Sequence, residues 1–216
     1  MFPASLSKIP SSLYLLSSNE PLLVRDWLDQ ARLALRQNDF EDIHTVTTES
    51  GFDWDSLLEE SAMLSLFSAK KCRVIVINSG KPGQKGSKTI QAICDQLPED
   101  MVFIFVIPAL DRPTKNSSWF KRIQQVGEVS ELKTPGDHQL VDWIIQRAGR
   151  KSLIVDKQSA SFLVERTEGN LLAADQELEK LSLRFCDQNT LSFEEIEQTV
   201  AQSSRYNHFV LVDACL

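Results

Sequence analysis

The sequence has few of the residues that build covalent or metal-centred sites. Its four cysteines stand singly, with no C-x-x-C pair and no histidine at ligand spacing; they are Cys72, Cys94, Cys186 and Cys215. This scatter argues against a disulfide framework and a zinc site, and it favours reduced thiols. The three histidines lie in no H-x-x-x-H or H-E-x-x-H frame. We therefore expect no metal, no cofactor and no catalytic centre.

Net positive charge and long apolar runs are also missing. The 216 residues include 23 basic and 30 acidic side chains, a net charge of -7, which gives no general electrostatic footprint for nucleic acid. The longest apolar run, 101–110, is too short to span a bilayer, and residues 1–5 lack the basic and apolar regions of a signal peptide. We expect a cytoplasmic protein with no membrane partner, in which DNA contact requires a local patch or other subunits.

The first part of the chain alternates strand-like and helix-like segments. The patterns predict strands at 12–17, 42–47, 73–78, 101–107 and 128–132, and helices at 20–36, 54–62, 87–96 and 115–125. The runs at 73–78 and 101–107 are β-branched and aromatic, which is typical of strands covered on both faces. Because parallel neighbours need crossover connections, the alternation predicts an α/β domain with a mainly parallel sheet flanked by helices.

The remainder of the chain predicts helices alone. Proline and glycine interrupt the pattern at 133–137, where we place the domain boundary, and helices are predicted at 137–148, 156–167, 170–185 and 192–202. Ser192 and Glu195 form a capping-box pattern for the last of these. A further helix begins near Tyr206 and still continues at Leu216. The expected division is an α/β domain at 1–136, a small helical domain at 137–205, and the start of a third domain at 206–216.

The position of a phosphate loop holds none of the residues that such a loop needs. A G-x-x-x-x-G-K-[ST] motif surrounds phosphates with backbone N–H groups and reaches the terminal phosphates with its lysine. The segment 17–25, which follows the first predicted strand, contains neither glycine nor lysine. Glu20 puts a carboxylate where a helix N-terminus would meet phosphate, and it is a favourable first residue for a helix. We interpret the segment as an ordinary strand-to-helix turn.

A second segment, 80–89, has a suitable composition but the wrong spacing. Lys85, rather than a glycine, stands five residues after Gly80, and Ser87 separates Gly86 from Lys88. A lysine so placed is not held by the loop, and the pattern is more typical of a solvated basic turn. The lysines of this segment remain candidates for non-specific contact with a phosphate backbone.

The most unusual connection follows the helix that ends near Ala62. Connections are normally polar, yet this one carries four large apolar side chains: Met63, Leu64, Leu66 and Phe67. Composition alone favours side chains that fill the top of the core. The alternative is an exposed apolar wedge that fits a partner's pocket.

Several segments, taken in order, resemble the delta subunit of the bacterial replicative clamp loader. Residues 15–24 are similar to the family's opening strand and degenerate phosphate loop, and Ser65-Leu66-Phe67-Ser68 is similar to its clamp-binding loop. Trp119-Phe120 resembles a late helix of the first domain, and 168–173 with 177–181 resembles a helix of the second. No one of these motifs decides the matter alone, but together they cover essentially the whole chain.

This resemblance implies a AAA+-like fold, in which a nucleotide-binding-type domain is followed by a helical lid and a helical collar that joins five subunits. It implies no bound ATP, and at Leu172, where ATP-using relatives place an arginine near the phosphates, the chain has an apolar residue. Collar assembly with the other clamp-loader subunits would need a third domain beyond Leu216. DNA contact is expected only within the assembled complex, as part of a DNA-directed DNA polymerase holoenzyme.

The resemblance also implies how the apolar connection works. Leu66 and Phe67 would enter a pocket on the ring-shaped sliding clamp, with Met63 and Leu64 supporting the contact, and the binding energy would favour the open ring. The cationic residues 70, 71 and 73 are either solvated charges at a strand edge or an attraction for an acidic clamp rim.

Two alternatives of other classes stay open at this point. One is a nucleotide-dependent AAA+-type enzyme with an atypical phosphate loop, which tight ATP binding would support. The other is a helical DNA-binding regulator, which needs a basic recognition helix. The acidic residues of the second domain argue against the regulator; they include Glu177, Glu179, Glu194, Glu195 and Glu197.

Overall fold

A computed structural model describes residues 11–62 and 70–201. The chain divides into two compact units, and the division falls between Thr134 and Pro135. Each unit has its own hydrophobic core. The extents assigned from the sequence to the clamp-binding, lid and collar domains stay predictions.

The first unit is built on a five-stranded parallel sheet in the order β2-β3-β4-β1-β5. The strands are β1 (Leu13–Ser17), β2 (Phe40–Thr47), β3 (Lys70–Val76), β4 (Met101–Ile107) and β5 (Glu128–Glu131). Chain order and sheet order together fix where the helices lie, because a crossover between parallel strands is right-handed. The connection from β1 runs towards the β2 edge, whereas the connections from β2, β3 and β4 run the opposite way. The predicted α/β fold with a parallel sheet and flanking helices is therefore confirmed.

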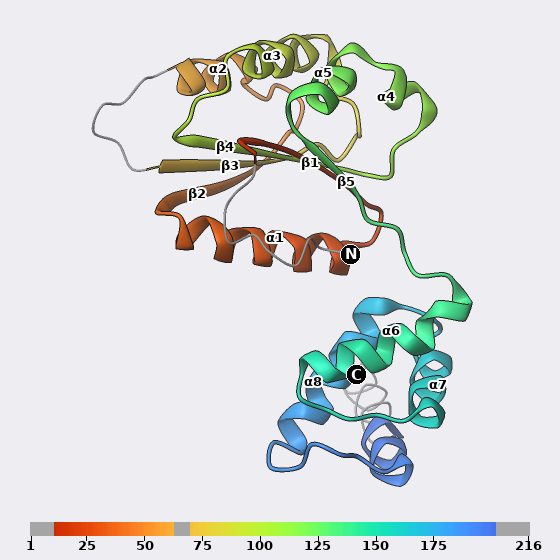
Figure 1. Cartoon of the computed structure of the whole chain (residues 1–216). Coiled ribbons are helices and arrows are strands. Elements are labelled where there is room, and N and C mark those ends of the chain that lie inside the picture. Colours follow the sequence, from red (N-terminus) through yellow and green to blue (C-terminus); the bar gives the residue numbers. More distant parts are fainter. Residues whose placement is uncertain (1–10, 63–69, 202–216) are drawn as a thin grey trace, which may run out of the picture. The chain divides into compact units, whose positions relative to one another are not determined.

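The helices consequently cover the two faces unequally. Helix α1 (Pro21–Gln37) lies on one face, and α2 (Trp54–Ala62), α3 (Gly83–Asp95) and α5 (Ser118–Val126) lie on the other (Figure 1). The core under α1 contains Trp27, Leu28 and Leu35 against apolar residues of β1, β3 and β4. The opposite core packs Trp54, Ile90 and Ile123 against the other face of the same strands. Strands covered on both faces need continuous apolar runs, which is why β4 is buried along its whole length.

Two segments differ from their predicted structure. The helix predicted at 115–125 is two helices, α4 (Arg112–Asn116) and α5, because Ser117 has an extended backbone between them. The segment predicted as a basic turn is partly helical, since α3 begins at Gly83. A Cβ atom at Gly86 would lie 2.6 Å from ring carbons of Trp54, so glycine there lets α3 approach α2 closely.

The second unit is helical. Its described helices are α6 (Asp137–Arg150), α7 (Lys157–Arg166), α8 (Leu171–Arg184) and a helical stretch at 193–201. The predicted capping box is present: the Glu195 N–H donates to the Ser192 hydroxyl at 3.3 Å, and the Ser192 N–H donates to the Glu195 carboxylate at 2.8 Å. Across residues 11–62 and 70–201, no helix has the length and apolar character needed to cross a membrane.

Candidate functional site

The carboxyl edge of the sheet is where a doubly wound fold usually binds nucleotides. The connection after β1 leads to α1 on one face, whereas the connection after the neighbouring strand β4 leads to α4 and α5 on the other. Such a change of direction opens a crevice between the ends of the two strands, and ligands bind there in related folds. Residues 17–20 lie at this crevice, so they occupy the position of the phosphate loop.

Hydrogen bonds bridge the segments that follow the strands at this crevice. The Ser17 hydroxyl donates to the Pro108 carbonyl at 2.8 Å, and the Ser18 hydroxyl donates to the Leu132 carbonyl at 2.9 Å. The side-chain oxygen of Asn19 accepts from the Ala109 N–H at 2.8 Å. These short polar side chains link the end of β1 to the segments after β4 and β5, at the place where a phosphate loop would present its backbone N–H groups.

A side chain of the protein itself also caps the start of α1, where a phosphate would bind. Glu20 is the N-cap of this helix, its carboxylate accepts from the Leu22 N–H at 3.2 Å, and Pro21 follows at the first helical turn. A carboxylate that caps a helix uses the positive end of the helix dipole itself, and it repels a second anion. The helix start predicted at Glu20 is confirmed, and the local chemistry opposes phosphate binding.

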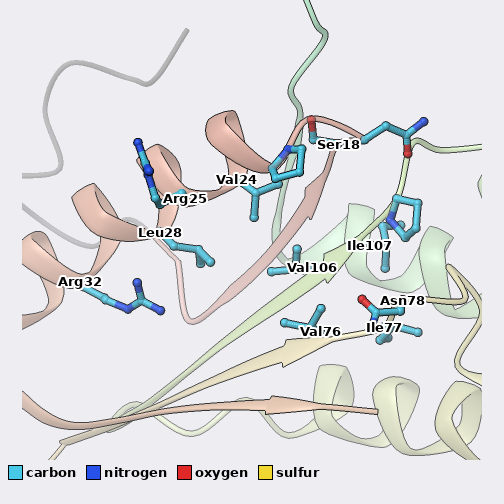
Figure 2. Close-up of a pocket in the computed structure, with 13 residues that line it drawn as sticks. Ser18, Val24, Arg25, Leu28, Arg32, Val76, Ile77, Asn78, Val106 and Ile107 are labelled. Carbon is cyan, nitrogen blue, oxygen red and sulfur yellow. The ribbon is translucent and has the colours of Figure 1, made fainter. Parts of the chain in front are cut away.

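A groove of about 430 Å³ lies beside this edge, between α1 and the ends of β3 and β4. Figure 2 shows Val24 and Leu28 of α1 facing Val76 and Val106 across it, with Arg32 at one end. Among the described residues, no acidic side chain lines the groove. A Mg²⁺-nucleotide needs carboxylate or hydroxyl oxygens on the metal, so this lining lacks the usual carboxylate ligand.

Other chemistry-bearing groups give no alternative centre. Within the described ranges, no cluster of three His, Cys, Asp or Glu side chains is placed to hold a metal ion. Burial raises the pKa of the Cys72 thiol to about 12 and that of Cys94 to about 11, so neither is a thiolate at neutral pH. Lys85, in the segment with phosphate-loop composition, pairs with Asp55 of α2 at 2.7 Å.

The apolar connection singled out in the sequence joins α2 to β3 at the opposite, amino edge. Met63, Leu64, Leu66 and Phe67 lie outside the described residues. Their attachment points are defined: α2 ends at Ala62 and β3 begins at Lys70. The interpretation of these four residues as a wedge therefore stays a prediction.

Near the start of β3 lies an ionic cluster that the sequence did not reveal, in which a buried arginine meets two partly exposed carboxylates. Arg73 is 9% exposed, and its guanidinium bonds both the Glu60 carboxylate of α2 and the Asp42 carboxylate of β2. The Nε atom donates to Glu60 Oε2 at 3.0 Å, and the terminal nitrogens donate to Asp42 Oδ1 at 3.1 Å and Oδ2 at 2.9 Å. We call Asp42, Glu60 and Arg73 the stem cluster.

The cationic residues of this region contact polar, acidic and aromatic groups of the same chain. Lys70 donates to the Asn38 carbonyl at 3.0 Å and lies 5.5 Å from the centre of the Phe40 ring, and Lys71 lies 3.9 Å from Glu60. The expectation of solvated strand-edge charges is wrong for Arg73. Strand β3 begins three residues earlier than predicted, which places Arg73 inside the strand, and its alternation turns this side chain inward.

A family comparison decides the assignment. The model of the family described as DNA polymerase III, delta subunit, matches residues 14–133. This chain belongs to the DNA polymerase III delta subunit family. The match spans the whole sheet, including the crevice and both attachment points of the apolar connection.

Curated relatives agree with membership of the delta family. DNA polymerase III subunit delta of Escherichia coli K12 is 28% identical over 213 residues, which cover 99% of this chain and 62% of the relative. The Haemophilus influenzae subunit delta is 26% identical and covers 94% of this chain and 60% of the relative. The chain thus spans about three fifths of the length of these relatives.

Solved structures give the fold. The Bacillus subtilis DNA clamp loader delta protein has a TM-score of 0.64 at 14% identity, and the match covers 87% of this chain and 57% of that one. The Thermotoga maritima RuvB Holliday junction branch migration motor, an AAA+ protein, has a TM-score of 0.52 at 14% identity, over 87% of this chain and 60% of that one. The delta-family chain is therefore AAA+-like in fold.

The stem cluster gives stability a defined dependence on acid. Hydrogen bonding to Arg73 is the main cause that lowers the pKa of Asp42 below its ordinary value of 3.8. A depressed pKa contributes stability that is present above pH 3.8 and is lost as pH falls through the lower folded value. We expect Asp42→Asn to remove this part of the acid dependence. Urea unfolding between pH 2.5 and 6 checks it, and equal slopes for both proteins below about pH 4 would contradict it.

Proposed function

We propose that this chain is the clamp-binding part of a clamp-loader delta subunit, and that it holds the DNA sliding clamp through the apolar connection 63–69. Leu66 and Phe67 enter an apolar pocket on the clamp, and Met63 and Leu64 support the contact. The observation that carries the proposal is family membership combined with four large apolar side chains in a connection between α2 and β3. Composition alone favours burial of these side chains in the core, and the resemblance to the family's clamp-binding loop is what favours a partner's pocket instead.

The chemistry of the carboxyl edge supports a role without catalysis. Glu20 caps α1, hydrogen bonds donated by Ser17 and Ser18 and accepted by Asn19 bridge the strand ends, and no acidic residue of the described ranges lines the adjacent groove. These features oppose the alternative of a nucleotide-dependent enzyme. In the proposed complex, ATP binding belongs to other subunits, and it controls access to the clamp-binding residues.

Ring opening follows if the chain fits one state of the clamp better than the other. A ligand shifts a conformational equilibrium only by its differential affinity for the two states. Leu66 and Phe67 supply affinity for the clamp. The rest of the first unit must then fit the opened subunit interface of the clamp more closely than the closed interface. The partners in the proposal are the sliding clamp and the other clamp-loader subunits, which join through a helical collar domain, with DNA bound only in the assembled complex.

The first test is direct binding to the sliding clamp of the same organism by surface plasmon resonance. Burial of two such side chains is worth about 3–6 kcal/mol before ordering costs, so Leu66→Ala/Phe67→Ala is expected to weaken binding by about 100-fold or more. The loss should lie mainly in a faster dissociation rate, because short-range contacts are removed.

A matched control separates this effect from general loss of apolar surface. Leu33 lies on α1 and is 60% exposed, so Leu33→Ala removes an apolar side chain elsewhere in the same unit and should bind as the unaltered chain does. Circular dichroism confirms that each variant is folded. A folded, unaltered chain that fails to bind the clamp would overturn the proposed function, as would a double variant that binds normally.

A further inference from the structure

The groove beside the carboxyl edge exists because one face of the sheet has little helical cover. Among the described elements, α1 alone lies on this face, whereas α2, α3 and α5 cover the other (Figure 1). The first turns of α1 therefore meet the ends of β3 and β4 across a space of about 430 Å³. Val24 and Leu28 form one wall, and Val76 and Val106 form the facing wall (Figure 2). Such a lining favours an apolar side chain as the occupant.

The polar side chains of the groove are cations, amides and a hydroxyl, and within the described ranges none of them is a carboxylate; they are Arg25, Arg32, Asn19, Asn78 and Ser18. Arg32 reaches from α1 towards the strands (Figure 2). It donates to the Asp29 carboxylate at 3.0 Å and to the Thr45 hydroxyl of β2 at 3.4 Å. These two bonds hold the guanidinium at one end of the groove, and they leave further N–H donors of its fork for a ligand.

A carboxylate is a better match for this arrangement than a phosphate group. Asp29 shares Arg32 in a pair that is largely exposed, and an exposed pair of this kind contributes little, so a second carboxylate can bind the same guanidinium at small cost. A nucleotide would instead place its phosphates near the carboxylate of Glu20, which caps α1. The apolar walls between the polar ends would also face a polar chain of phosphates and sugar.

The open side of the groove favours a protein as the ligand. Pockets for small molecules bury most of the surface of their ligand, whereas this groove remains open to solvent along its length. A partner protein covers such an opening with its own surface and inserts only one or a few side chains. The chemistry of the lining thus specifies both the inserted side chain and its neighbours.

We propose that this groove binds a segment of a partner protein in which a large apolar side chain is flanked by carboxylates. The apolar side chain lies between Val24 and Leu28 on one side and Val76 and Val106 on the other, and a flanking carboxylate accepts from Arg32. The inference goes beyond the proposed function, because none of the groove residues belongs to the connection that is proposed to bind the clamp.

The test uses three fluorescent peptides of equal length and measures their binding to the whole chain by anisotropy. The first has a central phenylalanine flanked by glutamates, the second has the same phenylalanine flanked by lysines, and the third has a central serine flanked by glutamates. The first is expected to bind about tenfold more tightly than either of the others, because only it offers both the apolar side chain and the complementary charge.

Variants of α1 locate the binding site. Arg32→Gln is expected to weaken binding of the first peptide about threefold to tenfold, and to reduce the loss of affinity between about 50 mM and about 500 mM salt. Val24→Glu adds a carboxylate to the wall and should weaken binding about tenfold, whereas Val24→Gln, of similar size but uncharged, should weaken it less. Arg36→Gln removes an exposed cation in the last turn of the same helix, outside the groove, and is the matched control.

Each outcome bears on the groove itself. Equal affinity for the glutamate and lysine peptides, or no binding of the glutamate peptide with phenylalanine, overturns the proposal. If that peptide binds Arg32→Gln as it binds Arg36→Gln, it binds elsewhere, and the proposal also fails. Displacement of the peptide by ADP would assign the groove to nucleotides instead. Circular dichroism checks folding, and Arg32→Gln decides alone if Val24→Glu does not fold.

Discussion

Asp175→Ala is expected to lower the free energy of unfolding of the helical unit by about 3–5 kcal/mol. Asp175 of α8 is 5% exposed and accepts from Arg147 Nε at 2.7 Å, and Arg147 of α6 is 9% exposed. Lys151 approaches the same carboxylate at 3.2 Å. Removal of the carboxylate takes its Asp175 partner from the buried Arg147 and one of two carboxylate partners from Lys151, which also pairs with Glu179. The loss of a partner from a buried guanidinium is what makes the change costly.

Fluorine NMR of protein labelled with 5-fluorotryptophan can follow this change in one unit alone. Trp143 lies in α6, 5.9 Å from the Arg147 guanidinium, and the other tryptophans belong to the first unit. Lys180→Ala is the matched control, because it breaks an exposed pair with Glu177 on the same helix and should cost well under 1 kcal/mol. If the two variants unfold at the same urea concentration, the pair between Arg147 and Asp175 does not contribute the expected free energy of unfolding.

Phe105→Ala is expected to destabilise the α/β unit by about 3–5 kcal/mol. Phe105 lies at the centre of β4, is fully buried, and pairs in register with Leu15 of β1 and Ile75 of β3. Its ring lies 6.4 Å from that of Phe103, with planes only 10° apart. Truncation opens a cavity between α2, α3 and the sheet that rigid strands on both sides cannot fill, so the cost includes lost contacts as well as lost burial.

Phe105→Leu is the volume-conserving comparison and should cost less than about 1.5 kcal/mol. Urea unfolding followed by the labelled indoles of Trp54 and Trp119, which share this core, measures both variants. The Trp143 signal should not move, because it belongs to the other unit. Comparable midpoints for the alanine and leucine variants would show that the core closes around the missing ring.

Local pattern was enough to predict most of the framework. The limits of β4 were predicted to the residue, since an apolar run bounded by charged and proline residues has one plausible interpretation. Helix starts were predicted where a side chain caps them, as Glu20, Asp53 and Asn170 do. The position of α1 on one face and of α2, α3 and α5 on the other followed only from the strand order, which no local pattern contains.

The candidate site was less predictable because it depends on distant partners. Period-two alternation along β3 could have predicted that Arg73 points inward. Its partners Asp42 and Glu60 come from two other elements, however, and only the fold brings these three residues together. The break at Ser117 was missed because the apolar spacing that predicts the helix lies in Trp119, Phe120 and Ile123, and the polar residues before them carry no periodicity that marks where the helix begins. The role proposed for Leu66 and Phe67 came from resemblance, since composition alone favoured burial in the core.

The crevice and the proposed clamp-binding connection lie at opposite ends of the same strands. The crevice lies at the carboxyl ends, and the attachment points of the connection lie at the amino ends. A strand such as β4, with seven residues, separates them by roughly 20 Å. Substitutions that erase one edge therefore leave the other chemically untouched. An AAA+-like protein can therefore lose nucleotide binding through substitutions at the carboxyl edge and still bind a partner at the amino edge, provided that the strands that separate the two edges remain rigid.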